Sequence, residues 1–99
     1  MSKKKVQLYS RRGETSITID AEITEDGALQ LSGQDIGEAP KEFWGDDDYE
    51  YWLLIPAEQK DRVLLALLEK LYQGNPRAVS EFQHFLKERK ILCSFHSWV

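Results

Sequence analysis

The sequence predicts an α+β fold, an antiparallel four-stranded β-meander followed by two antiparallel helices that pack on one face of the sheet. Segments in which apolar and polar residues alternate, as they do in strands, fill the first half of the chain. Two helical patterns, separated by the turn Gly74-Asn75-Pro76, fill the second half. Because the strands come first and the helices second, the order favours separate layers over an alternating βαβ arrangement.

The first two strands are predicted to form a hairpin that turns at Arg12 and Gly13, where glycine can adopt a positive φ. A two-residue loop would place Leu8 opposite Ile17, so that apolar side chains meet on one face. The second strand, residues 16–24, alternates strictly and is expected to present its polar face to water.

The second hairpin could close with either of two loops, and the apolar pattern decides between them. A two-residue Asp26-Gly27 turn would place Ile23 opposite Gln30 and mix apolar with polar side chains. A three-residue loop with Gly27 in the left-handed region instead places Ile23 opposite Leu29. We therefore expect the longer loop, followed by a short third strand.

A long connection is expected between Ser32 and the next strand. Residues 33–48 contain several glycines and Pro40, which are typical of irregular structure, and they could hold a helical turn near Asp35. Connections of this length in compact domains are often functional. Trp44 is predicted to anchor the segment to the core.

The fold is organised around the segment from Tyr49 to Tyr72. Both faces of residues 49–55 are apolar, so this strand is expected inside the sheet and not at its edge. Pro56 ends the strand and starts a helix, in which Leu68 belongs to an apolar stripe wide enough for two packing surfaces. This helix is predicted to form the core.

The turn after this helix contains a glycine for the left-handed C-terminal position, an asparagine that can cap and a proline for the next first turn (Gly74, Asn75 and Pro76). A second amphipathic helix is predicted from there to about Lys90, packed on the first. Residues 91–96 regain strand-like character and could return to the sheet as a fifth strand.

Length and composition predict one small globular domain. The chain of 99 residues suffices for a single domain spanning 1–99, in which residues 1–4 are expected to form a mobile tail. The single Cys93 cannot form an internal disulfide, and no apolar run reaches the roughly 18 residues of a membrane span. The lysines at the amino terminus precede no apolar segment of a secretory signal. We therefore expect a cytoplasmic protein with no membrane association.

Charge is segregated along the chain. The net charge is −4, but residues 1–12 carry five basic and no acidic side chains, and residues 13–58 carry one basic and thirteen acidic side chains. Residues 59–99 carry seven basic and four acidic side chains. Such asymmetry indicates an uneven surface potential and bears on the choice of partners, although neighbouring elements could also neutralise one another.

Two groups of side chains could carry chemistry. Asp46, Asp48 and Glu50 would share one side of an extended segment, as ligands of a hard cation do, but their spacing is not that of a calcium-binding loop. Cys93 and His96 have a C-x-x-H spacing, yet a single thiolate is unusual in a structural zinc site. The sequence therefore predicts no catalytic residue, no metal and no cofactor, and it does not predict an enzyme.

The predicted function is a small non-catalytic protein-binding or regulatory module with its contact surface on the acidic 33–50 region. A protein partner of basic character is expected, and nucleic acid is not expected as a partner. The sequence is also compatible with a homodimer. One alternative is a nucleic-acid-binding protein that uses the basic termini, and a second is a metal-assisted enzyme at the 46–50 loop. The candidate contact residues are Trp44, Asp46, Asp47, Asp48 and Glu50.

Overall fold

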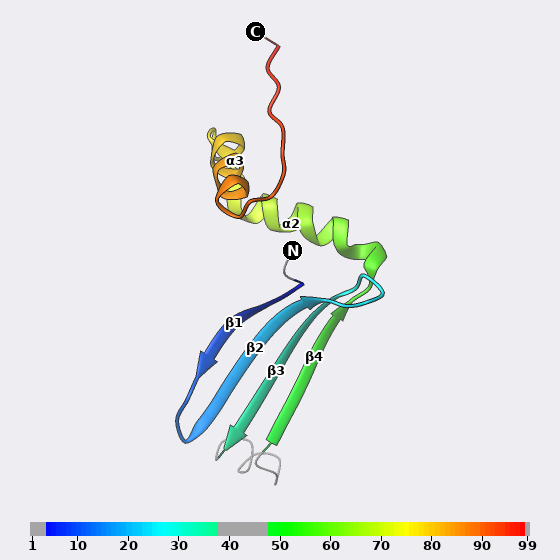
Figure 1. The fold of residues 1–99 in the computed structure, drawn as a ribbon, viewed down its shortest axis with the longest axis vertical. Helices are drawn as coiled ribbons and strands as arrows, with labels where there is room; N and C mark the ends of the chain where they lie inside the picture. The colour runs from blue at the N-terminus through cyan, green and yellow to red at the C-terminus, as the bar shows by residue number, and fades with distance from the viewer. Residues whose placement is uncertain (1–3, 38–47, 99) are drawn as a thin grey trace. The chain divides into compact units, whose positions relative to one another are not determined.

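The computed structural model describes residues 4–37 and 48–98, and it confirms the predicted α+β class. A four-stranded antiparallel meander is followed by two α-helices (Figure 1). The chain divides into two compact units, Met1–Val63 with the sheet and Leu64–Val99 with the helical part. The elements are β1 (Lys5–Arg11), β2 (Thr15–Ile23), β3 (Leu29–Gly37), β4 (Asp48–Ile55), the 3-10 helix η1 (Ala57–Gln59), α2 (Lys60–Tyr72) and α3 (Ala78–Glu88).

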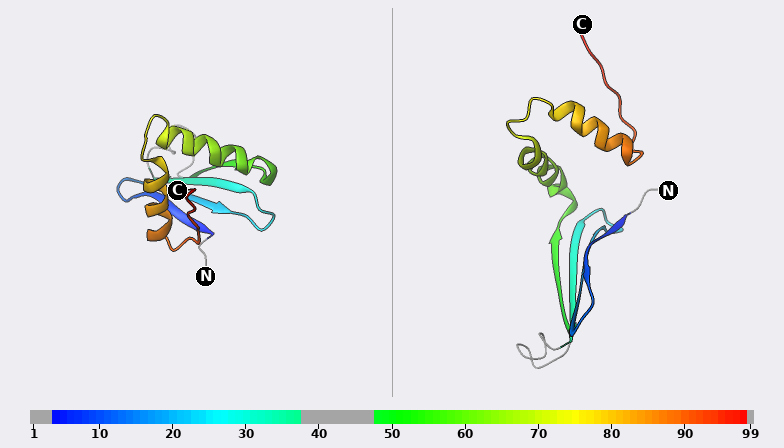
Figure 2. Two further views of the ribbon diagram at one scale, coloured as in Figure 1. Left: turned by 90° about the horizontal axis from the view of Figure 1, so that it is seen from above. Right: turned by 90° about the vertical axis from the view of Figure 1, so that its left-hand side faces the viewer.

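The strands lie in the order β1-β2-β3-β4 and form a single layer (Figure 2). The prediction that residues 49–55 lie inside the sheet is therefore wrong, because β4 is an edge strand of the sheet formed by the described residues. Apolar residues on both faces of a strand indicate what lies above and below it. They carry no information about how many strands lie beside it.

The second hairpin has the predicted register. Ile23 pairs with Leu29, and Gly27 has a φ of 85°, in the left-handed region. The side chain of Thr24 completes the loop, because its Oγ1 accepts a hydrogen bond of 3.1 Å from the N–H of Ala28. Each β2 residue is thereby paired with a β3 residue of the same face.

The first hairpin differs from the prediction. Ile17 pairs with Arg11 instead of Leu8, so the loop is longer than two residues. A register shift between Gln7 and Tyr9 marks a β-bulge, which brings Tyr9 onto the apolar face in place of Leu8. The sequence pattern could not show this, because a bulge adds one residue to a strand without changing its local alternation.

Strand β3 continues past Ser32 to Gly37, so the helical turn predicted near Asp35 is wrong. Gly33 is buried in this strand, and a Cβ atom placed there would overlap the ring of Tyr51 on β4. The glycine therefore lets the tyrosine ring lie flat against the sheet, and it is not a sign of irregular structure. The predicted anchor Trp44 lies outside the described residues.

Cross-strand pairing gives the sheet one apolar and one polar face. The apolar face carries Val6, Tyr9, Ile17, Ile19, Ala21, Ile23, Leu29, Leu31, Tyr49, Tyr51, Leu53 and Ile55, together with the charged residues Arg11 and Asp35, which pair with Ile17 on either side. The polar face carries Lys5, Gln7, Thr18, Asp20, Glu22, Gln30, Ser32, Gln34, Asp48 and Glu50, together with Trp52 and Leu54.

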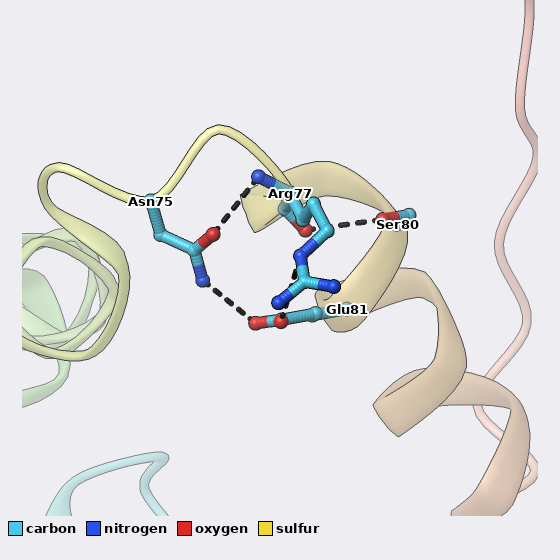
Figure 3. A network of polar contacts seen from close by, with 4 residues as sticks. All are labelled: Asn75, Arg77, Ser80 and Glu81. Carbon is cyan, nitrogen blue, oxygen red and sulfur yellow. Dashed lines mark hydrogen bonds and ion pairs between the residues drawn. The ribbon is translucent and has the colours of Figure 1, made fainter.

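The turn between the helices matches its prediction in part: Gly74 is left-handed as expected, but α3 begins at Ala78, two residues after Pro76, and its N-cap residue Arg77 has no side-chain cap hydrogen bond. Gly74 has a φ of 82°, and Asn75 Oδ1 accepts a hydrogen bond of 2.9 Å from the N–H of Arg77 (Figure 3). The amide Nδ2 of Asn75 donates to Glu81 Oε2 at 2.7 Å, and Ser80 Oγ donates to the carbonyl of Arg77 at 3.1 Å. One asparagine thus satisfies an otherwise unpaired N–H and also binds the first turn of α3.

Contact between α2 and α3 is made near this turn, where the ring centroids of Tyr72 and Phe82 are 6.0 Å apart. Leu68 is half-buried, whereas Leu64 and Leu71 of the same apolar stripe are exposed. The helical unit alone therefore leaves much of the α2 stripe open, unlike the closed core that the sequence predicts.

The carboxyl-terminal segment after α3 does not form the predicted fifth strand in residues 91–98. Lys90 has a φ of 58°, and the N–H of Ile91 donates to the carbonyl of Leu86 at 2.9 Å, which reverses the chain at the helix end. The segment then lies against α3, where Cys93 and Phe95 help to line an apolar pocket of about 310 Å³. None of the helices in the described residues is long and apolar enough to cross a membrane.

Candidate protein-contact surface

The predicted contact residues are only partly described. Asp48 and Glu50 lie at the start of β4, are exposed and share the polar face of the sheet. Trp44, Asp46 and Asp47 lie outside the described residues. The described part of this surface therefore lies on β4 and on the other three strands of the sheet.

Gln34 on β3 holds the two carboxylates together. Its Nε2 lies 3.2 Å from Asp48 Oδ1 and 3.3 Å from Glu50 Oε1, and both contacts are hydrogen bonds to an anionic acceptor. Gln34 is paired with Glu50 and follows Gly33 along β3. Sequence reasoning missed this residue because it ended the third strand near Ser32, although the correct register of the second hairpin, continued along β3, leads to it.

The polar face also contains a shallow pocket of about 230 Å³ between β1 and β4. The ammonium of Lys5 lies 3.9 Å from Asp20 Oδ2 at one end, and Trp52 lies at the other with 62% of its surface exposed. The pocket is lined by Lys5, Thr18, Asp20, Ser32, Gly33, Gln34, Glu50 and Trp52.

The described part of this face is acidic. It carries four carboxylates and one ammonium, which gives a formal charge of −3. The carboxylates are those of Asp20, Glu22, Asp48 and Glu50, and the ammonium is that of Lys5. Within residues 4–37 and 48–98, neither Asp48 nor Glu50 forms an ion pair.

Asp35 and Tyr51 form an unforeseen polar site on the apolar face. Asp35 pairs with Ile17 and Tyr49, and its Oδ1 is buried with no hydrogen-bond partner among the described residues. Burial raises the pKa of the Tyr51 phenol, and the nearby charge of Asp35 raises it further. Asp35 was predicted to lie in the connecting segment after Ser32, so it was not expected on this face of the sheet.

The described residues contain no group of three or more His, Cys, Asp or Glu side chains that could hold a metal ion. His96 Nε2 lies 3.2 Å from Ser94 Oγ, and His84 Nε2 lies 2.8 Å from Glu88 Oε1. Cys93 is exposed on the segment after α3. Of the C-x-x-H pair, His96 is therefore in contact with Ser94, and no further ligand group joins Cys93 within the described residues.

The basic clusters are distributed over both units. Lys4, Arg11 and Arg12 are exposed in or beside β1. At the end of α3, the guanidinium of Arg89 lies 5.3 Å from the centroid of the Phe85 ring, within the range of a cation–π contact. Where these basic residues lie does not test nucleic-acid binding, which stays an alternative prediction.

Comparisons with protein-family models, with curated proteins and with solved structures gave no match for this chain. The function is therefore inferred from the chemistry of the surface itself.

Proposed function

We propose that this protein is a non-catalytic protein-binding or regulatory module whose contact surface is the acidic half of β4. The observation that carries the proposal is the pair of hydrogen bonds from Gln34 to Asp48 and Glu50. These hydrogen bonds hold two exposed carboxylates that are neighbours on one face of β4. Because the two side chains are already ordered, binding a partner costs little additional conformational entropy.

The expected partner presents basic side chains. Carboxylates without a cation among the described residues attract lysine and arginine, and such complementarity raises association rates and excludes acidic partners. Trp52 follows Glu50 on the same face and is largely exposed, so it can supply the apolar anchor that protein interfaces commonly need. We place this module in the cytoplasm, in keeping with the single, unpaired Cys93.

The proposal is tested by affinity capture from the native cell followed by mass spectrometry. The bait is the full chain, in parallel with the double variant Asp48→Lys/Glu50→Lys. The matched control, Glu14→Lys/Glu69→Lys, makes the same change in net charge at exposed carboxylates elsewhere. We expect a basic protein to be retained by the wild type and the control and to be lost with the β4 variant.

The captured partner then allows a kinetic test. Charge reversal at the rim of an interface slows association more than it accelerates dissociation. We expect the single variant Glu50→Lys to lower the association rate at low salt, with a smaller difference at high salt, because screening weakens exposed charges. Equal retention by wild type and the β4 double variant would contradict the proposal.

A further inference from the structure

The two edges of the sheet differ in how well they are protected from pairing with another strand. The β1 edge contains a bulge between Gln7 and Tyr9, and it carries Lys5 and Arg11 near its ends. Bulges and basic side chains are the usual devices that keep an edge strand from pairing. The β1 edge is therefore protected.

The β4 edge has no such protection in the described strand. Its pairing with β3 is uninterrupted from Asp48 to Ile55, with no bulge, proline or lysine within it. Trp52, Leu53 and Leu54 are 62%, 60% and 59% exposed. Among the described residues no strand pairs with the outer side of β4, so its backbone groups there can accept another strand.

We propose that β4 pairs with β4 of a second copy of this chain, antiparallel, about a two-fold axis that passes through Trp52. Directly opposed residues in an antiparallel pair lie on the same face of the sheet. Since neighbouring residues of one strand point to opposite faces, a symmetric pair must place one residue opposite its own copy. The axis through Trp52 extends the pairing over residues 49–55, nearly the whole strand.

The strand is complementary to itself in this register. Tyr51 of one copy lies opposite Leu53 of the other, and Trp52 lies opposite Trp52. Glu50 lies opposite Leu54, so the carboxylates of the two copies are kept apart. An axis through Glu50 would instead place two carboxylates in direct opposition, which is destabilising.

A second copy suits this edge because the pairing also joins the apolar faces. The axis is perpendicular to the sheet, so both copies present their apolar faces on the same side, where the exposed Leu53 of each copy packs against Tyr51 of the other and lies diagonally across the axis from the second Leu53. One strand pair alone buries less than the roughly 800 Å² per partner of a standard stable interface. The dimer is therefore expected to depend on concentration.

Charge substitutions at Leu54 test the register, because this exposed side chain lies on the polar face opposite Glu50 of the other copy. Leu54→Lys should tighten the dimer, and Leu54→Glu should weaken it. Two symmetric cross-strand pairs predict a change of roughly two- to thirtyfold in the dimer dissociation constant in each direction. Sedimentation velocity over a concentration series measures it, with Gln7→Lys and Gln7→Glu on the same face of β1 as matched controls.

A disulfide cross-link tests the axis itself. In a Cys93→Ser background, Trp52→Cys places two thiols opposite each other at a cross-strand distance that allows a bond after a small adjustment. Under mild oxidation we expect a covalent dimer, and none for Gln7→Cys in the same background. Circular dichroism melts verify that each variant is folded.

The proposal is overturned if the wild type sediments as a monomer at about 1 mM, the range of weak association. It is also overturned if Leu54→Lys and Leu54→Glu shift the equilibrium in the same direction, or if Gln7→Cys cross-links as readily as Trp52→Cys. None of these measurements involves the basic partner, so they are independent of the proposed function.

Discussion

The position of the Tyr51 ring requires that residue 33 has no side chain. A Cβ at this position would overlap the ring of Tyr51, so Gly33→Ala must displace either the ring or the strand. We expect a loss of roughly 1–3 kcal/mol in the free energy of unfolding, as for other overpacked sites. Denaturant melts measure it.

The neighbouring substitution Ser32→Ala serves as the control and should change the stability by no more than about 0.5 kcal/mol. In a Tyr51→Ala background, Gly33→Ala should lose most of its effect, since the two side chains would no longer compete for the same space. A full additive loss in the double variant would contradict the packing argument.

Tyr51 should also give the protein a dependence on alkaline pH. Its pKa is raised in the folded state, so the neutral phenol is favoured there, and folding is stabilised below the unfolded pKa of about 10. This contribution is lost as the pH rises from that value through the folded pKa, because the unfolded chain then binds fewer protons. Tyr51→Phe removes the ionising group.

We therefore expect the variant to lose less stability than the wild type between about pH 9 and pH 11, the range around the ordinary tyrosine pKa. Urea melts across this range measure the difference. Tyr72→Phe is the control, since Tyr72 lies on α2, where its ring contacts that of Phe82. An identical alkaline loss in wild type and Tyr51→Phe would contradict the expectation.

At the scale of elements, the end of α3 contains a residue in a conformation that suits glycine. Lys90 has a φ of 58°, which costs a residue with a Cβ about 1 kcal/mol or more. Lys90→Gly should therefore stabilise the protein by about 1 kcal/mol, measured in thermal or denaturant melts. Arg89→Gly, at a φ of −90°, is the control and should be destabilising.

The elements that could be predicted from the sequence are those set by local chemistry. Gly27 and Gly74 adopt positive φ, as expected, because glycine has a short-range conformational preference that neighbours rarely override. Asn75 Oδ1 accepts a hydrogen bond from the N–H of Arg77 within the turn, but Asn75 is not the N-cap of α3. The second hairpin was predicted because two apolar patterns had to coincide on one face.

The features that could not be predicted depend on which strands are neighbours in the sheet and not on the local sequence pattern. The position of β4 at the edge and the bulge at Leu8 are set by which strands lie side by side. Of the candidate surface, the alternation of Asp48 and Glu50 followed from strand geometry. Gln34 was missed because a buried glycine before it was taken as the start of a loop.

For the whole molecule, the distribution of charge separates the proposed function from its nucleic-acid alternative. If the basic residues of the termini bind duplex DNA, the affinity must fall with salt by a slope of about −0.9 per phosphate contact. Lys3→Ala/Lys4→Ala/Lys5→Ala should then flatten that slope. We expect no measurable binding of duplex or single strands at physiological salt, because the thirteen carboxylates of residues 13–58 repel phosphates.

Fluorescence anisotropy with a labelled oligonucleotide over a salt series checks this expectation. The variant Lys60→Ala/Lys70→Ala, outside the terminal clusters, is the control. Micromolar, salt-sensitive binding that persists at physiological ionic strength would favour the alternative over a protein-binding module.

The bulge in β1 also decides whether assembly can continue beyond a pair. A sheet that joins two copies through β4 ends on both sides in a β1 strand whose extra residue interrupts the ladder, so association closes with a fixed stoichiometry. Deleting Leu8 would make the pairing of Gln7 and Tyr9 with β2 continuous and leave a regular outer edge. We expect this deletion to turn a closed dimer into open-ended polymers, measured as light scattering that grows with time. The one extra residue of the bulge would then be what limits assembly to two copies.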